Sequence, residues 1–170
     1  PFFIPILLPM RFVKHQRIDV QLPPMGANIL FLESFYGGSH RDFADGFIEN
    51  SRHRVKLITL PGRFWKWRLR TAAFTLYQAV ADPRSYDAVI ATDLLNLADL
   101  AALWPEPRPP VILYMHENQI SYPTPQDERT EYSFGFSNIV SALIADKIIF
   151  NSYFHMYAFL DALPGFISQC

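Results

Sequence analysis

Short apolar runs along this chain alternate with longer segments in which apolar residues recur at helical spacing. The runs are rich in Ile, Val, Leu or Phe without polar alternation, and they cover 28–33, 54–60, 87–91, 111–116 and 147–151. Such continuous runs are typical of strands that are buried on both faces. Helical patterns lie near 40–50, 64–81, 94–103, 128–144 and 153–162. The alternation predicts an α/β fold with a doubly wound parallel sheet of the Rossmann-like type.

Length and composition limit the chain to one domain. Its 170 residues, of which 50% are hydrophobic, suffice for one core but not for two full domains. We expect residues 1–26 to be a poorly structured lead and the domain to span 27–170. The apolar start, Pro1–Met10, is too short to span a bilayer, and basic residues follow it, which is the wrong order for a secretory signal. No membrane association is therefore expected.

Cysteine usage bears on the compartment. The single cysteine, Cys170, allows neither an intrachain disulfide nor a cysteine metal cluster. Nothing in the sequence favours an oxidising environment, so we expect a cytoplasmic protein.

Two adjacent glycines mark the turn between the first strand and the first helix. The apolar run ends at Leu32, and Gly37, Gly38, Ser39 and His40 lie where the helix is expected to begin. Such a turn directs free backbone N–H groups and the positive end of a helix at a bound group, which suits a phosphate or a sugar hydroxyl. The alternative is that Gly-Gly only forms a tight turn. The spacings of the dinucleotide fingerprint and of the lysine-containing phosphate loop are absent, which disfavours nicotinamide cofactors and P-loop hydrolysis.

Polar side chains gather after the fourth predicted strand. His116, Glu117, Asn118 and Gln119 are consecutive, and Tyr122 lies three residues further on. In parallel sheets ligands bind beyond the carboxyl ends of the strands, so this cluster is the best catalytic candidate. A histidine there can position a sugar, bond a substrate hydroxyl or act as a general base, and the alternative is a histidine bonded to neighbouring backbone. No second histidine lies at i+4, so we expect no metal site.

Two further strand ends carry polar residues before a helix. Thr92 and Asp93 precede a helix that we expect to begin at Leu94, with Asp93 as its N-cap. Asn151 and Ser152 follow the last strand in the same way, and Ser152 is a natural N-cap. Capping explains Asp93 adequately, and a ligand role is the alternative. Asn151 and Ser152 are candidate substrate ligands, although an asparagine before a helix is also common without a ligand.

The second predicted helix combines tryptophan with arginine. Trp65 falls on a stripe of apolar and small residues and is expected in the core, whereas Trp67 and Arg70 lie on the other side. An exposed tryptophan flanked by Arg63 and Arg70 suits stacking on a base or sugar while the arginines contact phosphates. The alternative is that this face packs on another domain or subunit.

Charge is segregated along the chain although the net charge is only -1. Residues 41–84 hold nine Lys or Arg against four Asp or Glu, whereas residues 85–170 hold three against ten. A basic segment of this kind either marks a surface that binds a polyanion or reflects surface helices without a partner.

Several of these motifs, in this order, resemble the tRNA-queuosine mannosyltransferase family, whose members are also described as glycosyltransferase-like domain-containing proteins. The motifs are ILFLESFYGGSH at 29–40, LP with WKWR in 60–68, LNL with LAAL in 95–103, HENQ with YP in 116–123, and FNS at 150–152. The resemblance extends over residues 28–163. It implies a retaining glycosyltransferase of the two-domain GT-B architecture that transfers mannose from GDP-mannose to the queuosine base of a tRNA.

The resemblance also implies roles for the candidate residues. The Gly37–Gly38 turn would approach the donor diphosphate or the transferred sugar, and the His116–Gln119 segment would hold the acceptor or the sugar. The face of Trp67 and Arg70 would contact tRNA. No cofactor is implied beyond the nucleotide-sugar donor. The resemblance leaves open whether His116 acts as a base or whether the departing phosphate assists the incoming hydroxyl.

The second domain of the GT-B architecture, which should carry most contacts to guanosine and diphosphate, is not contained in these 170 residues. We therefore expect little or no transferase activity from this chain alone. Two other functions stay open: a non-catalytic α/β module that binds RNA through its tryptophan helix, and an enzyme that uses another nucleotide-sugar and a small acceptor. Salt-dependent tRNA binding without a response to GDP-mannose would favour the first, and transfer to a lipid or free sugar would favour the second.

Overall fold

A six-stranded sheet lies at the centre of the molecule, for which the computed structural model describes residues 6–8, 26–122 and 132–169. The strands are β1 (Ile6–Leu8), β2 (Asn28–Tyr36), β3 (Arg54–Pro61), β4 (Ala88–Thr92), β5 (Val111–Met115) and β6 (Lys147–Phe150). Their order is β1-β6-β5-β4-β2-β3, and every pair is parallel except β1 with β6. The predicted α/β fold and its parallel sheet are therefore confirmed.

Helices connect the strands at the predicted places. They are α1 (Gly38–Asn50), α2 (Trp65–Ala79), α3 (Leu97–Leu103), α4 (Tyr132–Ile144) and α5 (Tyr153–Ile167), with a short 3-10 helix at Pro83–Ser85. α3 begins later than predicted, α5 ends later, and the predicted first turn of α4 falls at 128–131, outside the described residues. Within the described ranges, no helix has the length and apolar character needed to cross a bilayer.

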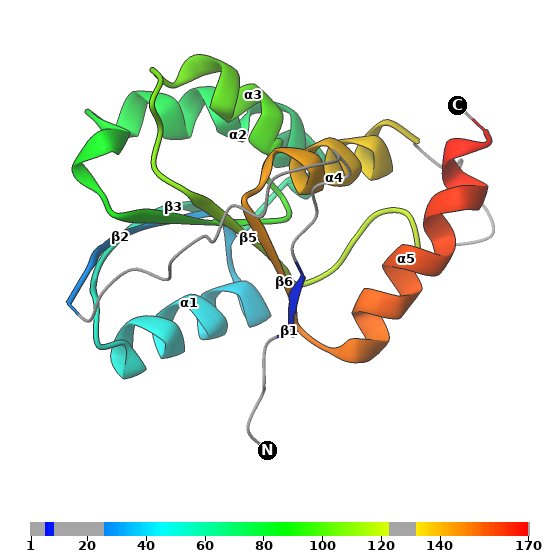
Figure 1. Ribbon diagram of the computed structural model, residues 1–170, viewed down its shortest axis with the longest axis horizontal. Coiled ribbons are helices and arrows are strands. Elements are labelled where there is room, and N and C mark those ends of the chain that lie inside the picture. Colours follow the sequence, from blue (N-terminus) through cyan, green and yellow to red (C-terminus); the bar gives the residue numbers. More distant parts are fainter. Residues whose placement is uncertain (1–5, 9–25, 123–131, 170) are drawn as a thin grey trace, which may run out of the picture.

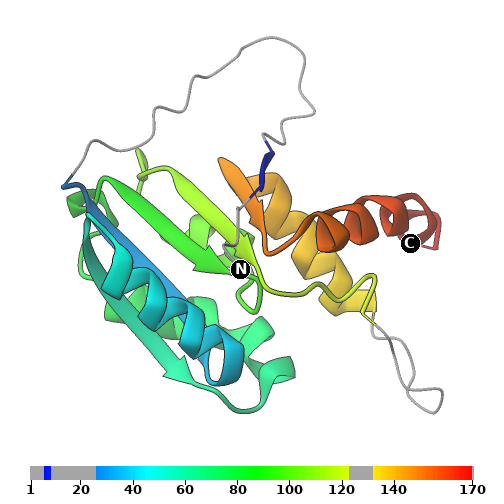
Figure 2. The same cartoon turned by 90° about the horizontal axis from the view of Figure 1, so that it is seen from below.

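These helices cover both faces of the sheet (Figures 1 and 2). α1 lies on one face, where Ile29 and Phe31 of β2 pack with Ala44. α2, α3 and α4 lie on the other face, where Leu30 and Leu32 of β2 are fully buried. Because successive side chains of a strand point to opposite faces, the continuous apolar run of β2 supplies both cores. The prediction of strands buried on both faces is thus confirmed for β2, β4 and β5. It was wrong for β3, where Arg54 and Lys56 are exposed, because β3 lies at the edge of the sheet.

The short strand β1 was not predicted. It pairs with β6 in the antiparallel direction, with Ile6 opposite Phe150 and Leu8 opposite Ile148. It lies within residues 1–26, which the sequence analysis assigns to a poorly structured lead, and the rest of that lead up to residue 25 lies outside the described residues. The domain boundary near residue 27 stays a prediction.

The strand order reverses at β2. β3 lies on one side of β2, and β4, the next strand in the chain, lies on the other. In doubly wound sheets this reversal opens a crevice beyond the carboxyl ends of the strands. Glu33 of β2, Asp93 after β4 and His116 after β5 all lie at this edge. The register of β2 with β3 also shifts between Glu33 and Tyr36, an irregularity of the kind that re-aims side chains near sites.

Candidate functional site

The glycine turn leads from β2 directly into α1. Gly37 is the N-cap of α1, and Gly38 has a φ of 53°, in the left-handed region where a glycine avoids the clash of a Cβ atom. Gly62, just after β3, lies so close that a Cβ atom on it would be 2.9 Å from the Cα atom of Gly37. The predicted strand-to-helix turn is confirmed, and a third glycine forms part of its wall.

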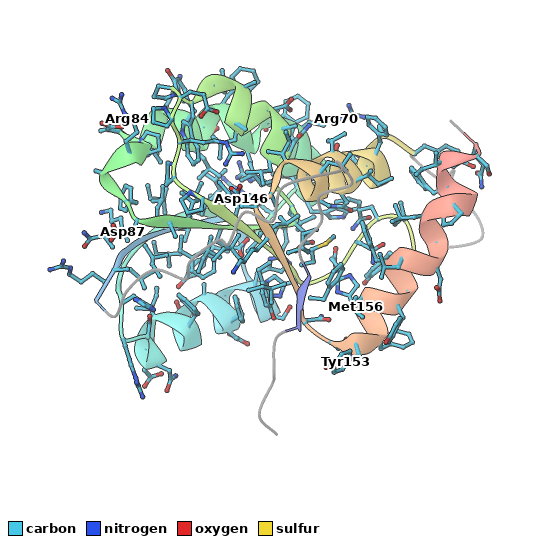
Figure 3. The ribbon with its side chains drawn as sticks, in the orientation of Figure 1. Arg70, Arg84, Asp87, Asp146, Tyr153 and Met156 are labelled. Atoms are coloured by element: carbon cyan, nitrogen blue, oxygen red, sulfur yellow. The ribbon has the colours of Figure 1, made fainter. Side chains whose placement is uncertain are left out.

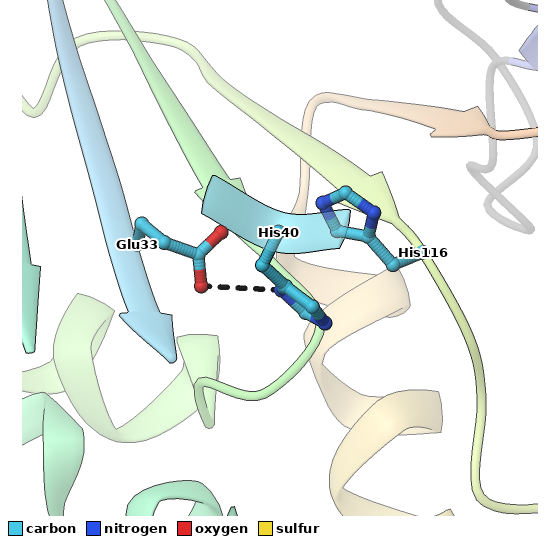
Figure 4. A group of neighbouring side chains, drawn as sticks. All are labelled: Glu33, His40 and His116. Atoms are coloured by element: carbon cyan, nitrogen blue, oxygen red, sulfur yellow. Dashed lines mark hydrogen bonds and ion pairs between the residues drawn. The ribbon is translucent and has the colours of Figure 1, made fainter. Parts of the chain in front are cut away.

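Glu33, His40 and His116 form a cluster beside this turn (Figure 4). Oε1 of Glu33 lies 3.2 Å from Nδ1 of His40 and accepts hydrogen bonds from the hydroxyl of Thr92 at 3.0 Å and the backbone N–H of Phe35 at 2.8 Å. The rings of His40 and His116 have centroids 4.0 Å apart and are tilted by 33°. Because Nδ1 of His40 is held by Glu33, the ring is fixed in one orientation.

The pKa values of the two histidines are shifted in opposite directions. Burial acts to lower the pKa of His40, but the hydrogen bond with Glu33 and the charges of Asp93 and Glu117 outweigh it, so this pKa is raised. Burial, followed by the repulsion of His40, lowers the pKa of His116 to about 3. His116 is therefore uncharged at neutral pH, and a group with this pKa is a weak general base there.

Asp93 does not cap a helix, so that prediction was wrong. α3 begins at Leu97, and its N-cap is Asn96. Oδ1 of Asp93 instead accepts a hydrogen bond from the backbone N–H of His116 at 2.9 Å. Burial raises the pKa of Asp93 to about 7, with His40 opposing the rise. Local spacing made Asp93 resemble a cap, but His116, the first residue after the neighbouring strand β5, supplies its actual partner.

A pocket of about 400 Å³, which we call the glycine-loop pocket, opens next to the cluster. The predicted site residues that line it are Gly37, Gly38, Ser39, His40, Glu117, Gln119 and Tyr122. Gly62 and Trp65 complete part of the wall. Nε2 of Gln119 donates to Oε1 of Glu117 at 3.0 Å, which holds these two side chains together. The structure thus brings together two segments that the sequence analysis singled out separately.

Three predicted ligands make their hydrogen bonds within the protein. Oδ1 of the buried Asn118 accepts from the backbone N–H of Ser121 at 2.8 Å. Nδ2 of Asn151 donates to the carbonyl of His116 at 2.7 Å. Oγ of Ser152 accepts from the first turn of α5 at 3.1 Å, which confirms the predicted N-cap. These bonds fix the loops around the pocket, and a substrate contact by any of the three stays a prediction.

Helix α2 carries its two tryptophans differently. Trp67 is 63% exposed, as predicted. Trp65 is only half-buried rather than part of the core, and its ring packs on Phe134 of α4 with centroids 5.3 Å apart. Nη2 of Arg70 donates to Oγ of Ser133 at 2.7 Å, which places Arg70 beside α4 (Figure 3).

A second hollow, the tryptophan groove, lies between α2 and α4 and has a volume of about 510 Å³. It is lined by Phe64, Trp65, Lys66, Trp67, Arg70 and Phe134. Trp65 belongs to the walls of both hollows, so the groove adjoins the glycine-loop pocket. The guanidinium carbon of Arg63 lies 5.9 Å from the centre of the Phe64 ring. All three predicted tRNA-binding residues are therefore at or beside this groove.

The cluster also has the composition of a metal site. One potential ligand atom each from Glu33, His40 and His116 lies within 4.8 Å of the others. The spacing of histidines along the sequence predicts no metal site, because it cannot reveal a group of ligands that come from three separate elements. Glu33 was missed altogether, although a charged residue inside an apolar strand is itself a signal of a buried partner. The absence of a metal stays a prediction.

Residues 28–170 match the family model described as tRNA-queuosine alpha-mannosyltransferase N-terminal. This chain belongs to that family. The match confirms the family to which the sequence motifs pointed. The tRNA-queuosine alpha-mannosyltransferase of Drosophila melanogaster is 36% identical to it over 144 residues.

The alignment with the Drosophila protein covers 84% of this chain. It spans only 38% of the length of that relative. No solved structure matches the chain.

Proposed function

We propose that this chain is the acceptor-side domain of a glycosyltransferase that transfers mannose from GDP-mannose to the queuosine base of a tRNA. Two observations support the proposal: the membership of the family and the convergence of the motif residues on one pocket. The second carries the mechanism, because the Gly37–His40 and Glu117–Tyr122 segments meet at the carboxyl edge of the sheet, where folds of this class bind ligands.

The glycine turn is proposed to bind the donor. Gly37, the N-cap of α1, makes no side-chain hydrogen bond to the start of the helix, and the positive end of that helix favours a diphosphate. His40 lines the same pocket with a raised pKa, so it carries positive charge more readily than a free histidine. We assign His40 to stabilising the charge that develops on the departing diphosphate.

The transfer itself is proposed to retain configuration. The bond between mannose C1 and the diphosphate oxygen breaks while C1 bonds to the acceptor hydroxyl oxygen, and the hydroxyl proton passes to the departing phosphate. His116, whose pKa is about 3, suits positioning better than proton transfer, and Asp93 holds its backbone. Glu117 and Gln119 are assigned to holding the sugar or acceptor, as the motifs imply.

The remaining parts of the proposal concern binding outside the pocket. Arg63, Trp67 and Arg70 are assigned to tRNA, since stacking and phosphate contacts require an exposed aromatic ring with cations beside it. We assign most contacts to guanosine to a region that corresponds to the part of the Drosophila relative outside the alignment. We therefore expect these 170 residues alone to transfer little or no mannose.

The deciding experiment is a mannose-transfer assay with the full-length protein, GDP-mannose and tRNA with or without queuosine. Transfer that requires queuosine supports both donor and acceptor. Transfer from a different nucleotide-sugar, or to a small acceptor, would replace those assignments while keeping the reaction class. Salt-dependent tRNA binding with no transfer from any donor would overturn the enzyme in favour of the RNA-binding module. Assaying these 170 residues in parallel tests the expected inactivity of the isolated domain.

A further inference from the structure

Phe64 has an unusual backbone conformation for a bulky side chain. Its φ and ψ are 58° and 51°. Among the described residues, Phe64 is the only non-glycine residue with a positive φ. A Cβ atom makes this left-handed conformation unfavourable, so residues are held in it only where the surroundings impose it. Such strain is concentrated at functional sites. At the N-cap of α2, the Phe64 carbonyl accepts hydrogen bonds from the N–H groups of Trp67 and Arg68 at 2.9 and 3.0 Å.

The side chain of Phe64 is also highly exposed, at 73%. With Trp65, Trp67 and Phe134 it gives the tryptophan groove an aromatic lining. Exposing an aromatic ring at a strained position is doubly unfavourable for the isolated domain. A flat partner that covers the ring would offset this cost.

Positive charge surrounds the aromatic lining. Arg63 lies beside Phe64, while Lys66 and Arg70 form part of the groove, with Arg70 5.2 Å above the Phe134 ring. Helix α2, Trp65–Ala79, contains no Asp or Glu. A partner that is flat, unsaturated and anionic matches this combination, and an unstacked nucleotide has these properties.

We propose that the tryptophan groove binds one unstacked base of a single-stranded RNA segment, with Phe64 as the stacking residue. The inference rests on the proposed function, because the groove adjoins the glycine-loop pocket through Trp65. The base in the groove is a neighbour of the nucleoside that enters the pocket. Phe64 thus selects for single-stranded RNA, while the arginines bind phosphate in any conformation.

The test measures the dissociation constants of the full-length protein for a fluorescent single-stranded oligoribonucleotide and for the same sequence as a duplex. Phe64→Ala should weaken single-strand binding on the order of 10-fold and leave duplex binding and the salt dependence unchanged. Arg70→Gln should weaken both complexes and lower the salt slope by about one. The assay contains no sugar donor, so its result is independent of whether mannose is transferred.

Two further variants separate stacking from folding. Phe64→Gly relieves the backbone strain, so it should melt no lower than the wild-type protein and still lose single-strand affinity. Phe74→Ala removes a 59% exposed phenylalanine of the same helix that does not line the groove, and it should bind like the wild-type protein. Unchanged single-strand binding by Phe64→Ala, an equal loss for the duplex, or an equal loss in Phe74→Ala would overturn the proposal.

Discussion

A single methyl group added to Gly62 tests whether close backbone packing fixes the glycine-loop pocket. A Cβ atom there would lie 2.9 Å from both the Cα atom of Gly37 and the carbonyl oxygen of Tyr36. Carbon atoms in contact prefer roughly 3.5 Å or more, so the two backbone segments must separate by about 0.6 Å. Both neighbours are backbone atoms that cannot rotate away, unlike the end of a flexible side chain.

The expected cost of Gly62→Ala follows from that overlap. Overpacking of this kind costs about 1–3 kcal/mol, and in a domain of this size each kcal/mol lowers Tm by roughly 2–4 °C. We therefore expect Tm to fall by about 2–12 °C. Displacement of Gly37 should also slow mannose transfer by the full-length protein, up to about 100-fold if the donor shifts with the loop.

Gly46→Ala is the matched control for this variant. Gly46 lies in α1, and a Cβ atom there would have nothing within 4 Å. The same substitution should therefore stabilise the helix by about 0.5–1 kcal/mol and leave transfer unchanged. Thermal unfolding followed by circular dichroism and the transfer assay measure both effects. A Gly62→Ala protein with wild-type Tm and wild-type transfer would refute the argument that this contact shapes the pocket.

Three other outcomes are expected. The folded pKa of Asp93 is about 7 and its usual value is 3.8, so the folded state binds a proton that the unfolded state has lost. The contribution of Asp93 to the free energy of unfolding is present below pH 3.8 and disappears as the pH rises to about 7. Asp93→Asn should remove this pH dependence, measured by urea unfolding at a series of pH values. The same pH dependence of stability in the variant and the wild-type protein would contradict the assigned pKa. His116→Ala should lower transfer by the full-length protein without unfolding it, and because the pKa of His116 is about 3, the wild-type rate should show no titration of this residue between pH 5 and 8. Prolonged treatment with a metal chelator should leave transfer unchanged, whereas a loss restored by added Zn²⁺ would identify Glu33, His40 and His116 as a metal site.

Local features of the sequence determined much of the fold. The apolar runs of β2, β4 and β5 are visible without a structure because a strand buried on both faces has no polar alternation. The Val, Leu and Ile content of β3 also marked it as a strand, although its Arg54 and Lys56 are exposed. Gly37–Gly38 and Ser152 were identifiable because turn and cap chemistry depends on neighbours within a few residues. The exposure of Trp67 followed from helical periodicity alone.

The tertiary structure decided which of these residues meet. The turn from β2 to α1 places His40 beside Glu33, but only the pairing of β2 with β4 and of β4 with β5 brings His116, which follows β5, next to them. The same pairing gives Asp93 the backbone of His116 as its partner in place of the predicted helix. Trp65 is half-buried because a groove lies beside it, between α2 and α4. The spacing of apolar residues along α2 cannot reveal such a groove. Periodicity records which face of an element is buried, whereas the identity of the neighbour depends on contacts between residues far apart in the chain.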